Sequence, residues 1–264
     1  MSGEVRTKRC DRWGPVRKTL VIGNWKMHKT VAEAVAFARA LSACLPERAD
    51  CDVAIAPPFT ALHPLREVLR GSPIALCAQD VHGEDEGPFT GEVSAPMLAD
   101  VGCLYGLVGH SERRRLFGET NEEVNRKARA LLRAGIRPVV CVGESLEERE
   151  ADQTFSVIRR QLKEGLNNLS ADDIRRTIVA YEPVWAIGTG KTASPGQAQE
   201  AHDFIRQFIG HRAGKETAAE VRILYGGSVN PENAASLMAQ KDIDGVLAGG
   251  ASLEVDSFRR LIHH

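Results

Sequence analysis

Short apolar runs recur along the chain, and longer stretches with helical spacing of apolar residues separate them. The runs are rich in Val, Ile and Leu, and they are short enough for strands that are buried on both faces. Eight strands are therefore predicted, at residues 19–23, 52–56, 74–78, 104–109, 138–142, 177–181, 221–225 and 245–248.

Several of the intervening stretches begin with recognisable helix starts. A hydroxyl residue followed three positions later by Glu can form a capping box, and proline is tolerated at the first helical position. The predicted starts are Thr30 with Glu33, Thr120 with Glu123, Ser194-Pro195-Gly196-Gln197, and Asn230-Pro231.

The order of strand and helix, repeated eight times, predicts an α/β fold. Parallel strands need crossover connections, and eight such units close into a (β/α)8 barrel, the TIM barrel, of about 250 residues. An open doubly wound sheet is the alternative, but it normally has a G-x-G-x-x-G turn after its first strand. The first strand here ends in Gly23-Asn24-Trp25-Lys26. We therefore expect one barrel domain over residues 19–264.

Composition narrows the possible classes of function. The 34 Lys and Arg residues nearly balance the 35 Asp and Glu residues, which argues against a nucleic-acid partner. None of the six cysteines forms a C-x-x-C pair, so zinc and dithiol redox motifs are absent. Disulfides favour small secreted domains, and we therefore expect a cytoplasmic protein. We also expect no metal and no cofactor. No apolar run reaches about 18 residues, so no membrane segment is predicted. Residues 1–18 are basic but lack the apolar core of a secretory signal, and we expect a disordered leader there.

Polar residues follow most of the predicted strands, at the end where barrels build their active sites. Glycine pairs follow the last two strands, where barrels commonly bind phosphate. These candidates are Asn24 and Lys26 after the first strand, Gln79 after the third, His110 after the fourth, Glu144 after the fifth, Glu182 after the sixth, Gly226-Gly227-Ser228 after the seventh, and Gly249-Gly250 after the eighth.

Taken singly, each candidate has an ordinary structural explanation. Lys26 could be a solvated lysine, His110 a helix cap, and the glycine pairs plain turns. Together they predict a site for a small phosphorylated molecule. A carboxylate and an imidazole that face each other suit proton abstraction next to a carbonyl, and Lys26, His110 and Asn24 could then stabilise the oxyanion.

Four segments resemble the motifs of the triosephosphate isomerase family, in the family's order. They are Gly23-Asn24-Trp25-Lys26-Met27, Gly109-His110-Ser111-Glu112-Arg113-Arg114, the eleven residues from Tyr181-Glu182-Pro183 to Lys191, and Tyr225-Gly226-Gly227-Ser228-Val229. The resemblance implies interconversion of dihydroxyacetone phosphate and D-glyceraldehyde 3-phosphate in glycolysis and gluconeogenesis.

The resemblance also implies a role for each motif residue. Glu182 would move a proton between C1 and C2 through a cis-enediolate. His110 would act as a neutral electrophile, because the positive end of the helix that follows disfavours imidazolium. Lys26 would offset negative charge, Asn24 would donate to the substrate oxygen, and Glu112 would support this group. The phosphate would be bound by Asn24, Lys26, Gly188, Ser228, Gly249 and Gly250.

A lid is implied over the site, and this family is a standard example of such lids. Tyr225 and Ser228 would hold it closed, which would shield the enediolate from loss of phosphate. The lid residues would be Pro183, Val184, Trp185, Ala186, Ile187, Gly188, Thr189, Gly190, Lys191, Thr192 and Ala193.

A homodimer is implied by residues 79–92, which resemble the loop that inserts into a second subunit. His28 and Pro88 depart from the residues that are common in the family at these two positions. The expected interface residues are Met27, Gln79, Phe89, Thr90, Gly91 and Glu92.

Two other functions compete with the isomerase. One is an aldolase-type lyase in which Lys26 forms a Schiff base, and the other is a non-catalytic phosphate-binding scaffold. Against the lyase, Lys26 follows the first strand in a motif that matches the isomerase family, and Glu182 would have no role. The presence of Asn24, Lys26, His110 and Glu182 together counts against the scaffold.

Overall fold

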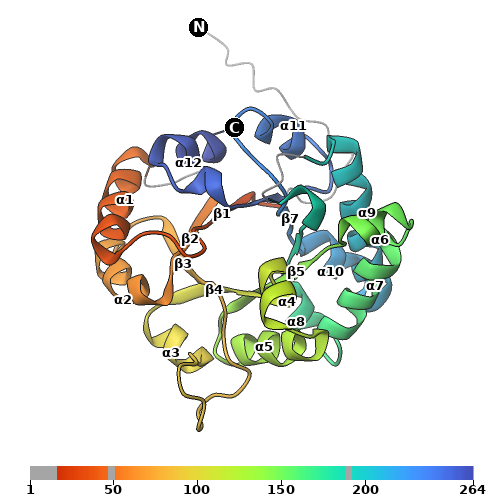
Figure 1. Cartoon of the computed structure of the whole chain (residues 1–264), viewed down its shortest axis with the longest axis horizontal. Coiled ribbons are helices and arrows are strands. Elements are labelled where there is room, and N and C mark those ends of the chain that lie inside the picture. Colours follow the sequence, from red (N-terminus) through yellow and green to blue (C-terminus); the bar gives the residue numbers. More distant parts are fainter. Residues whose placement is uncertain (1–16, 47–50, 188–191, 264) are drawn as a thin grey trace, which may run out of the picture.

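A computed structural model describes residues 17–46, 51–187 and 192–263; the rest of the chain, including leader residues 1–16, lies outside the described part. Eight parallel strands form a closed barrel in chain order, and β8 pairs with β1 (Figure 1). The predicted fold is confirmed. The strands are β1 (Leu20–Asn24), β2 (Asp52–Ala56), β3 (Ile74–Ala78), β4 (Cys103–Val108), β5 (Arg137–Val142), β6 (Ile178–Tyr181), β7 (Ile223–Tyr225) and β8 (Gly245–Ala248).

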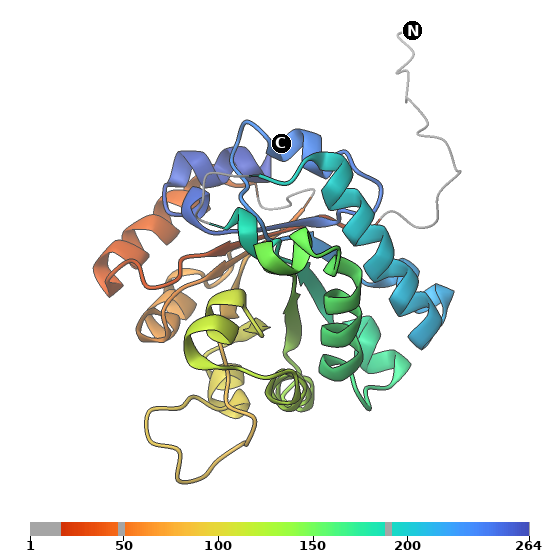
Figure 2. The same ribbon diagram turned by 45° about the vertical axis from the view of Figure 1, so that its right-hand side comes forward.

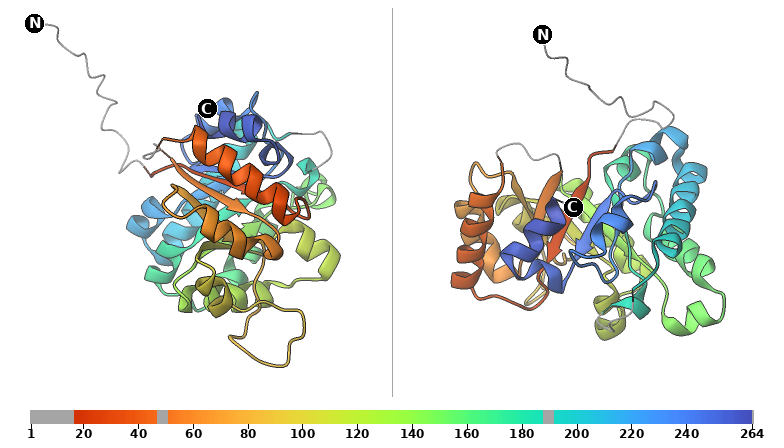
Figure 3. Two further views of the ribbon diagram at one scale, coloured as in Figure 1. Left: turned by 90° about the vertical axis from the view of Figure 1, so that its left-hand side faces the viewer. Right: turned by 90° about the horizontal axis from the view of Figure 1, so that it is seen from above.

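Helices surround the barrel, and α1 packs against α2 on one side of it (Figure 3, left). They are α1 (Val31–Cys44), α2 (Phe59–Val68), α3 (Ala95–Asp100), α4 (Ser111–Phe117), α5 (Asn121–Arg133), α6 (Leu146–Glu150), α7 (Thr154–Gly165), α8 (Ala171–Arg176), α9 (Pro195–Ala213), α10 (Lys215–Glu220), α11 (Ala234–Met238) and α12 (Val255–Ile262), with the short 3₁₀ helices η1 (Val184–Ala186) and η2 (Gly250–Ser252). None of the described helices is long and apolar enough to cross a bilayer.

Three strands have the predicted bounds, at 52–56, 74–78 and 245–248, and the others shift by one or two residues. The largest shift is in β7, which begins at Ile223 and not at Val221. The amide of Val221 bonds to Thr217 O and so ends α10, which delays the strand. Boundaries of this kind depend on neighbouring elements and not on the apolar run alone.

The apolar side chains form two layers. One fills the barrel, and the other lies between the barrel and the helices, as alternate residues of a strand point to opposite faces. The inner layer includes Leu20, Ile22, Leu107, Leu224 and Leu247. A closed, filled barrel is rigid, and it presents all strand ends at one rim.

Three predicted helix starts are confirmed as capping boxes, at Thr30, Thr120 and Ser194. The start predicted at Asn230-Pro231 is wrong. There the Asn230 side chain accepts the amides of Glu232 and Asn233, which makes a turn, and α11 begins only at Ala234. Asn competes for nearby backbone amides in this way, so its signal does not separate a turn from a helix start.

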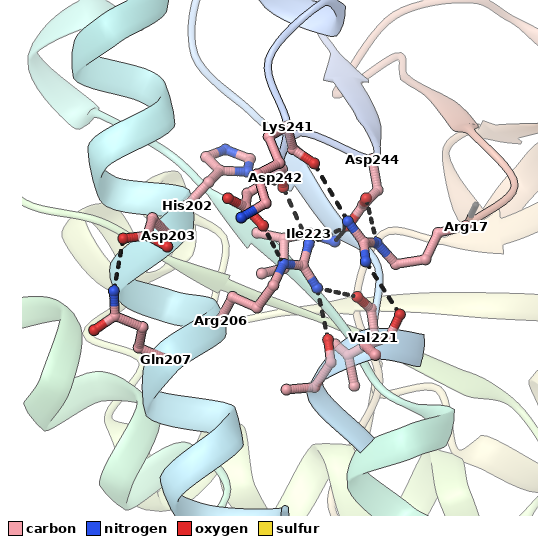
Figure 4. Close-up of polar contacts among 12 residues, drawn as sticks. Arg17, His202, Asp203, Arg206, Gln207, Val221, Ile223, Lys241, Asp242 and Asp244 are labelled. Atoms are coloured by element: carbon pink, nitrogen blue, oxygen red, sulfur yellow. Dashed lines mark hydrogen bonds and ion pairs between the residues drawn. The ribbon is translucent and has the colours of Figure 1, made fainter. Parts of the chain in front are cut away.

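Arg17 and Lys18, which the sequence groups with the leader, are bound to the barrel at the N-terminal ends of its strands. Arg17 pairs with Asp244 at 2.5 Å, and Lys18 pairs with Asp52 at 2.7 Å. Figure 4 shows that Arg206 of α9 joins the same group through Asp242 and Asp244. These ion pairs connect the start of the barrel to β2 and to the segment that precedes β8.

Candidate active site

A cavity of about 270 Å³ opens at the C-terminal ends of the strands. Most of the polar residues predicted there line it, whereas Gln79 and Glu144 do not. The lining consists of Asn24, Lys26, His110, Glu182, Ile187, Gly226, Gly227, Ser228, Val229, Leu247, Gly249, Gly250 and Ala251. The tertiary structure thus brings together residues from β1, β4, β6, β7 and β8.

Glu182 follows β6 and is 2% exposed. Its amide donates to Val142 O at 2.7 Å, which ties it to the end of β5. Its Oε2 accepts the amide of Ser111 at 2.8 Å, at the first residue of α4. This bond anchors the carboxylate of Glu182 to the N-terminal turn of α4.

His110 is the N-cap residue of α4. Its Nδ1 accepts the amide of Glu112 at 3.2 Å. Because Nδ1 acts as an acceptor, the proton of a neutral imidazole must lie on Nε2. Nε2 is 3.1 Å from Oε1 of Glu182. The geometry therefore places Nε2 of His110 beside the carboxylate of Glu182.

Lys26 adopts a left-handed conformation, with φ of 52°. Two side chains hold this backbone: Asn24 Oδ1 accepts the amide of Lys26 at 3.1 Å, and Gln79 Nε2 donates to Lys26 O at 2.8 Å. A non-glycine residue at positive φ costs free energy, which the surrounding bonds must offset. Gln79, expected at an interface, thus also supports the cavity.

The ammonium of Lys26 lies 2.6 Å from Glu112 Oε1. Burial by itself raises the pKa of Glu112, but its bond to Lys26 and the charge of Lys26 outweigh this and lower the pKa overall. Glu112 is thus held ionised beside the cavity without lining it. Its contact with Lys26 fixes the direction of that positive charge.

Glycine is required at the turn after β7. A Cβ on Gly226 would lie 2.9 Å from Glu182 Cγ, and one on Gly227 would lie 2.3 Å from the Tyr225 hydroxyl. After β8, a Cβ on Gly249 would lie 3.5 Å from Lys26 Cε, while the same position on Gly250 is open. Backbone amides at these turns can therefore approach an anion closely, next to a lysine.

Glu144, after β5, is fully buried, does not line the cavity, and contacts Trp185 in the segment predicted to be a lid. It accepts the Trp185 indole N–H at 2.9 Å and the Tyr181 hydroxyl at 3.1 Å, and Arg149 pairs with it at 3.0 Å. The guanidinium of Arg149 also lies over the Trp185 ring, 4.8 Å from its centroid. This group holds Trp185, in the segment that the sequence predicts to be a lid, a contact that the position of Glu144 after a strand did not reveal.

The remaining residues predicted for the site are Tyr225 and the proposed lid, part of which lies outside the residues that the structure describes. Tyr225 is buried, and burial raises its pKa to about 12, partly opposed by the backbone of Ala193 at the far end of the lid. Of the residues predicted to form a lid, the structure describes 183–187, Thr192 and Ala193, whereas Gly188, Thr189, Gly190 and Lys191 lie outside the described residues. No group of three potential metal ligands occurs among the residues that the structure covers.

Sequence reasoning missed some residues that shape the site. The amide of Ser111 binds the carboxylate of Glu182, and a Cβ on Gly143 would collide with Glu182 O. Ser111 could have been found from its place after a strand-end histidine. The need for glycine at 143 carries no sequence signal, because it arises from a residue that is distant along the chain.

The fold and the cavity together define a (β/α)8-barrel enzyme that transfers protons within a small anionic substrate. The carboxylate of Glu182 can accept a proton, Nε2–H of His110 can stabilise the oxyanion, and the glycine turns with Lys26 can bind an anionic group.

Comparison with known proteins narrows this class. A sequence model described as triosephosphate isomerase matches residues 19–264. A triosephosphate isomerase of Endomicrobium trichonymphae is 53% identical over 249 residues, which cover 94% of this chain and 99% of the relative. Triosephosphate isomerases of Geotalea uraniireducens and Carboxydothermus hydrogenoformans are 50% and 52% identical, each over 94% of this chain and 98% of the relative. The chain belongs to the triosephosphate isomerase family.

Proposed function

We propose that Glu182 is the base, and His110 the electrophile, with which this isomerase interconverts dihydroxyacetone phosphate and D-glyceraldehyde 3-phosphate. The reaction follows from membership of the family. The observation that supports the two roles is the 3.1 Å separation between His110 Nε2 and Glu182 Oε1 inside one cavity. A base and an electrophile must reach adjacent atoms of one substrate, and this spacing allows it.

The proposed reaction begins with the phosphate at the glycine turns and Lys26. Glu182 leaves the Ser111 amide and removes a proton from C1, and the C–H electron pair forms the C1–C2 double bond of a cis-enediolate. Nε2–H of His110 donates to the oxygen that gains charge and carries protons between the two oxygens. Glu182 then returns its proton to C2. Asn24 donates to the substrate oxygen.

Lys26 and Glu112 have supporting roles in this scheme. The ammonium neutralises charge on the enediolate and the phosphate, and Glu112, 2.6 Å away, keeps it aimed at the cavity. The lid would cover the intermediate, with Gly188 contributing an amide to the phosphate and Tyr225 and Ser228 holding the closed form. Enclosure slows the loss of phosphate from the enediolate.

A coupled isomerase assay tests the assignment. Glu182→Gln should lower kcat by about 10²–10⁴-fold, the usual contribution of a general base. Glu216→Gln, an exposed glutamate on α10, is the matched control. Near-normal turnover in Glu182→Gln would overturn the role of Glu182.

Borohydride trapping with substrate should leave no adduct on Lys26, which separates this mechanism from a Schiff-base lyase. Exchange of substrate hydrogen for solvent deuterium separates it from a binding protein.

We also propose a homodimer that forms through the segment 79–92 and Met27. This segment projects from the barrel between β3 and α3 (Figure 2, lower left), and Met27 is 94% exposed. Large exposed apolar side chains indicate an interaction surface. The proposed contacts are Met27, Gln79, Phe89, Thr90, Gly91 and Glu92.

Sedimentation of the purified protein tests the dimer. Phe89→Glu should shift the protein to monomer, whereas Leu146→Glu, an equally exposed apolar residue on α6, should not. A monomeric unmodified protein would refute the proposal.

We further infer that the enzyme acts in the cytoplasm, as expected of an enzyme of glycolysis. Recovery of its activity in another cell fraction would contradict this.

A further inference from the structure

Arg114 lies one turn into α4 and has no role in the mechanism above, yet its guanidinium reaches two strand ends. Its Nε donates to Gly109 O at 2.8 Å, at the end of β4, and its Nη2 donates to Cys141 O at 3.2 Å, near the end of β5. Its Nη1 donates to Asn121 Oδ1 at 2.6 Å. A planar guanidinium fixes the relative positions of the groups that it binds, because its donors have a rigid geometry.

The β4 contact fixes the peptide that carries His110. Gly109 precedes His110 and has φ of +72°, and a Cβ there would lie 2.8 Å from Arg114 Nη2. The amide of Gly109 is also bound, to Glu119 Oε1 at 3.1 Å. Both polar groups of Gly109 are therefore held by charged side chains, immediately before the imidazole.

The β5 contact is one residue from the backbone that holds Glu182. Cys141 O accepts from Arg114, and the next carbonyl, that of Val142, accepts the amide of Glu182 at 2.7 Å. Arg114 thus connects the end of β4, which leads into His110, to the end of β5, which binds the start of the Glu182 segment. Burial lowers the pKa of Arg114, while the nearby charges of Glu119 and Glu182 act in the opposite direction.

We propose that Arg114 is a positioning residue that sets the distance between His110 and Glu182 through the main chain of two strand ends. This inference rests on the roles proposed above for those two residues. Arg114 acts on the reaction only through the placement of His110 relative to the base. Its loss should therefore affect the chemical step more than substrate binding, because the phosphate is bound by other turns.

A double-mutant cycle tests this proposal on the full-length enzyme. Arg114→Met should lower kcat by about 10–100-fold, the effect of misplacing a catalytic group by up to an ångström, and should change KM less than about threefold. In a His110→Gln background, the same change should lower kcat less than about twofold, because a residue that acts through His110 has nothing left to place. Thermal unfolding of all four proteins separates a loss of stability from a loss of turnover.

Equal reductions of kcat in both backgrounds would refute the proposal, since a merely structural residue acts independently of His110. If His110→Gln itself left kcat unchanged, the proposed function would fail instead, so the two failures are distinguishable. Arg115→Met, the neighbouring and exposed arginine of α4, is the matched control and should leave kcat unchanged in both backgrounds.

Arg114→Lys provides a second variant, and it also completes the cycle if Arg114→Met does not fold. Lysine keeps the positive charge but lacks the planar fork that bonds to two carbonyls at once. We expect its kcat to remain within about threefold of that of Arg114→Met. Recovery of unmodified kcat in Arg114→Lys would show that charge alone matters, and would overturn the geometric explanation.

Discussion

His110 Nε2 and Glu182 Oε1 lie 3.1 Å apart although their side chains follow β4 and β6, which are separated by β5. The strand between them, β5, contributes to this short distance. Arg114 donates to the carbonyl of Cys141 near the end of β5, and the amide of Glu182 donates to the carbonyl of Val142, the next residue. The spacing between His110 and Glu182 thus depends on three strand ends and not on the two side chains alone.

Gly226→Ala should disturb the base directly. The added Cβ would lie 2.9 Å from Glu182 Cγ, so the carboxylate must shift. We expect kcat to fall by about 10–100-fold, because a small misplacement of a catalytic group has an effect of this size. The measurement is steady-state turnover, with Gly196→Ala on α9 as a control whose Cβ meets only Ser194 Oγ, at 4.0 Å. Equal activity in the two variants would contradict this explanation.

Lys26→Met should weaken binding of the anionic part of the substrate. A charged hydrogen bond to phosphate contributes about 1.5–3 kcal/mol, so the inhibition constant of inorganic phosphate should rise at least about tenfold. The matched control is Lys29→Met, which removes a nearby lysine that lies over the rings of Trp25 and Phe37 and does not line the cavity. If both variants bound phosphate as the unmodified enzyme does, Lys26 would not be a phosphate ligand.

Glu144→Gln should impair the lid without touching the cavity. The change leaves Arg149 without its buried partner and replaces an acceptor of both Trp185 and Tyr181. We expect a loss of about 1–3 kcal/mol in stability, and a larger share of substrate converted to methylglyoxal, because the enediolate is less well enclosed. Quantifying methylglyoxal per turnover tests this. An exposed substitution such as Glu147→Gln should leave that share unchanged.

His202 should make the protein sensitive to acid. It is fully buried on α9, and burial lowers its pKa to about 3, although its bond to Asp242 O acts in the opposite direction. An unfolded histidine has a pKa of about 6.5. Below about pH 6.5 the unfolded chain therefore binds a proton that the folded protein does not, and stability falls, by about 2 kcal/mol at pH 5.

The measurement is the free energy of unfolding at pH 7 and pH 5, at one protein concentration. His202→Gln should lose less stability over this interval than the unmodified protein, because glutamine does not titrate. The control is His211→Gln, which changes an exposed histidine in the last turn of α9 and should behave as the unmodified protein does. Identical losses in all three proteins would show that His202 does not govern the acid sensitivity.

Much of the fold could be predicted, because buried parallel strands and their crossover helices leave regular patterns. The predicted element boundaries were wrong where the same local sequence pattern is compatible with two kinds of structure. Asn230 produced a turn before α11, and Val221 completed a helix in place of starting a strand. The candidates at strand ends were predictable as a set, because the barrel places all such ends at one rim.

The sequence by itself determined the alternation of strands and helices, the glycine turns, and which residue types stand at the strand ends. Only the tertiary structure decided that Glu144 turns towards Trp185, that Glu112 pairs with Lys26, and that Arg114 joins β4 to β5. The physical reason is the separation along the chain of the residues that interact. Helical and strand patterns reflect interactions between residues close in the chain, whereas the partner of a buried charge is chosen by the packing of elements that are distant in sequence.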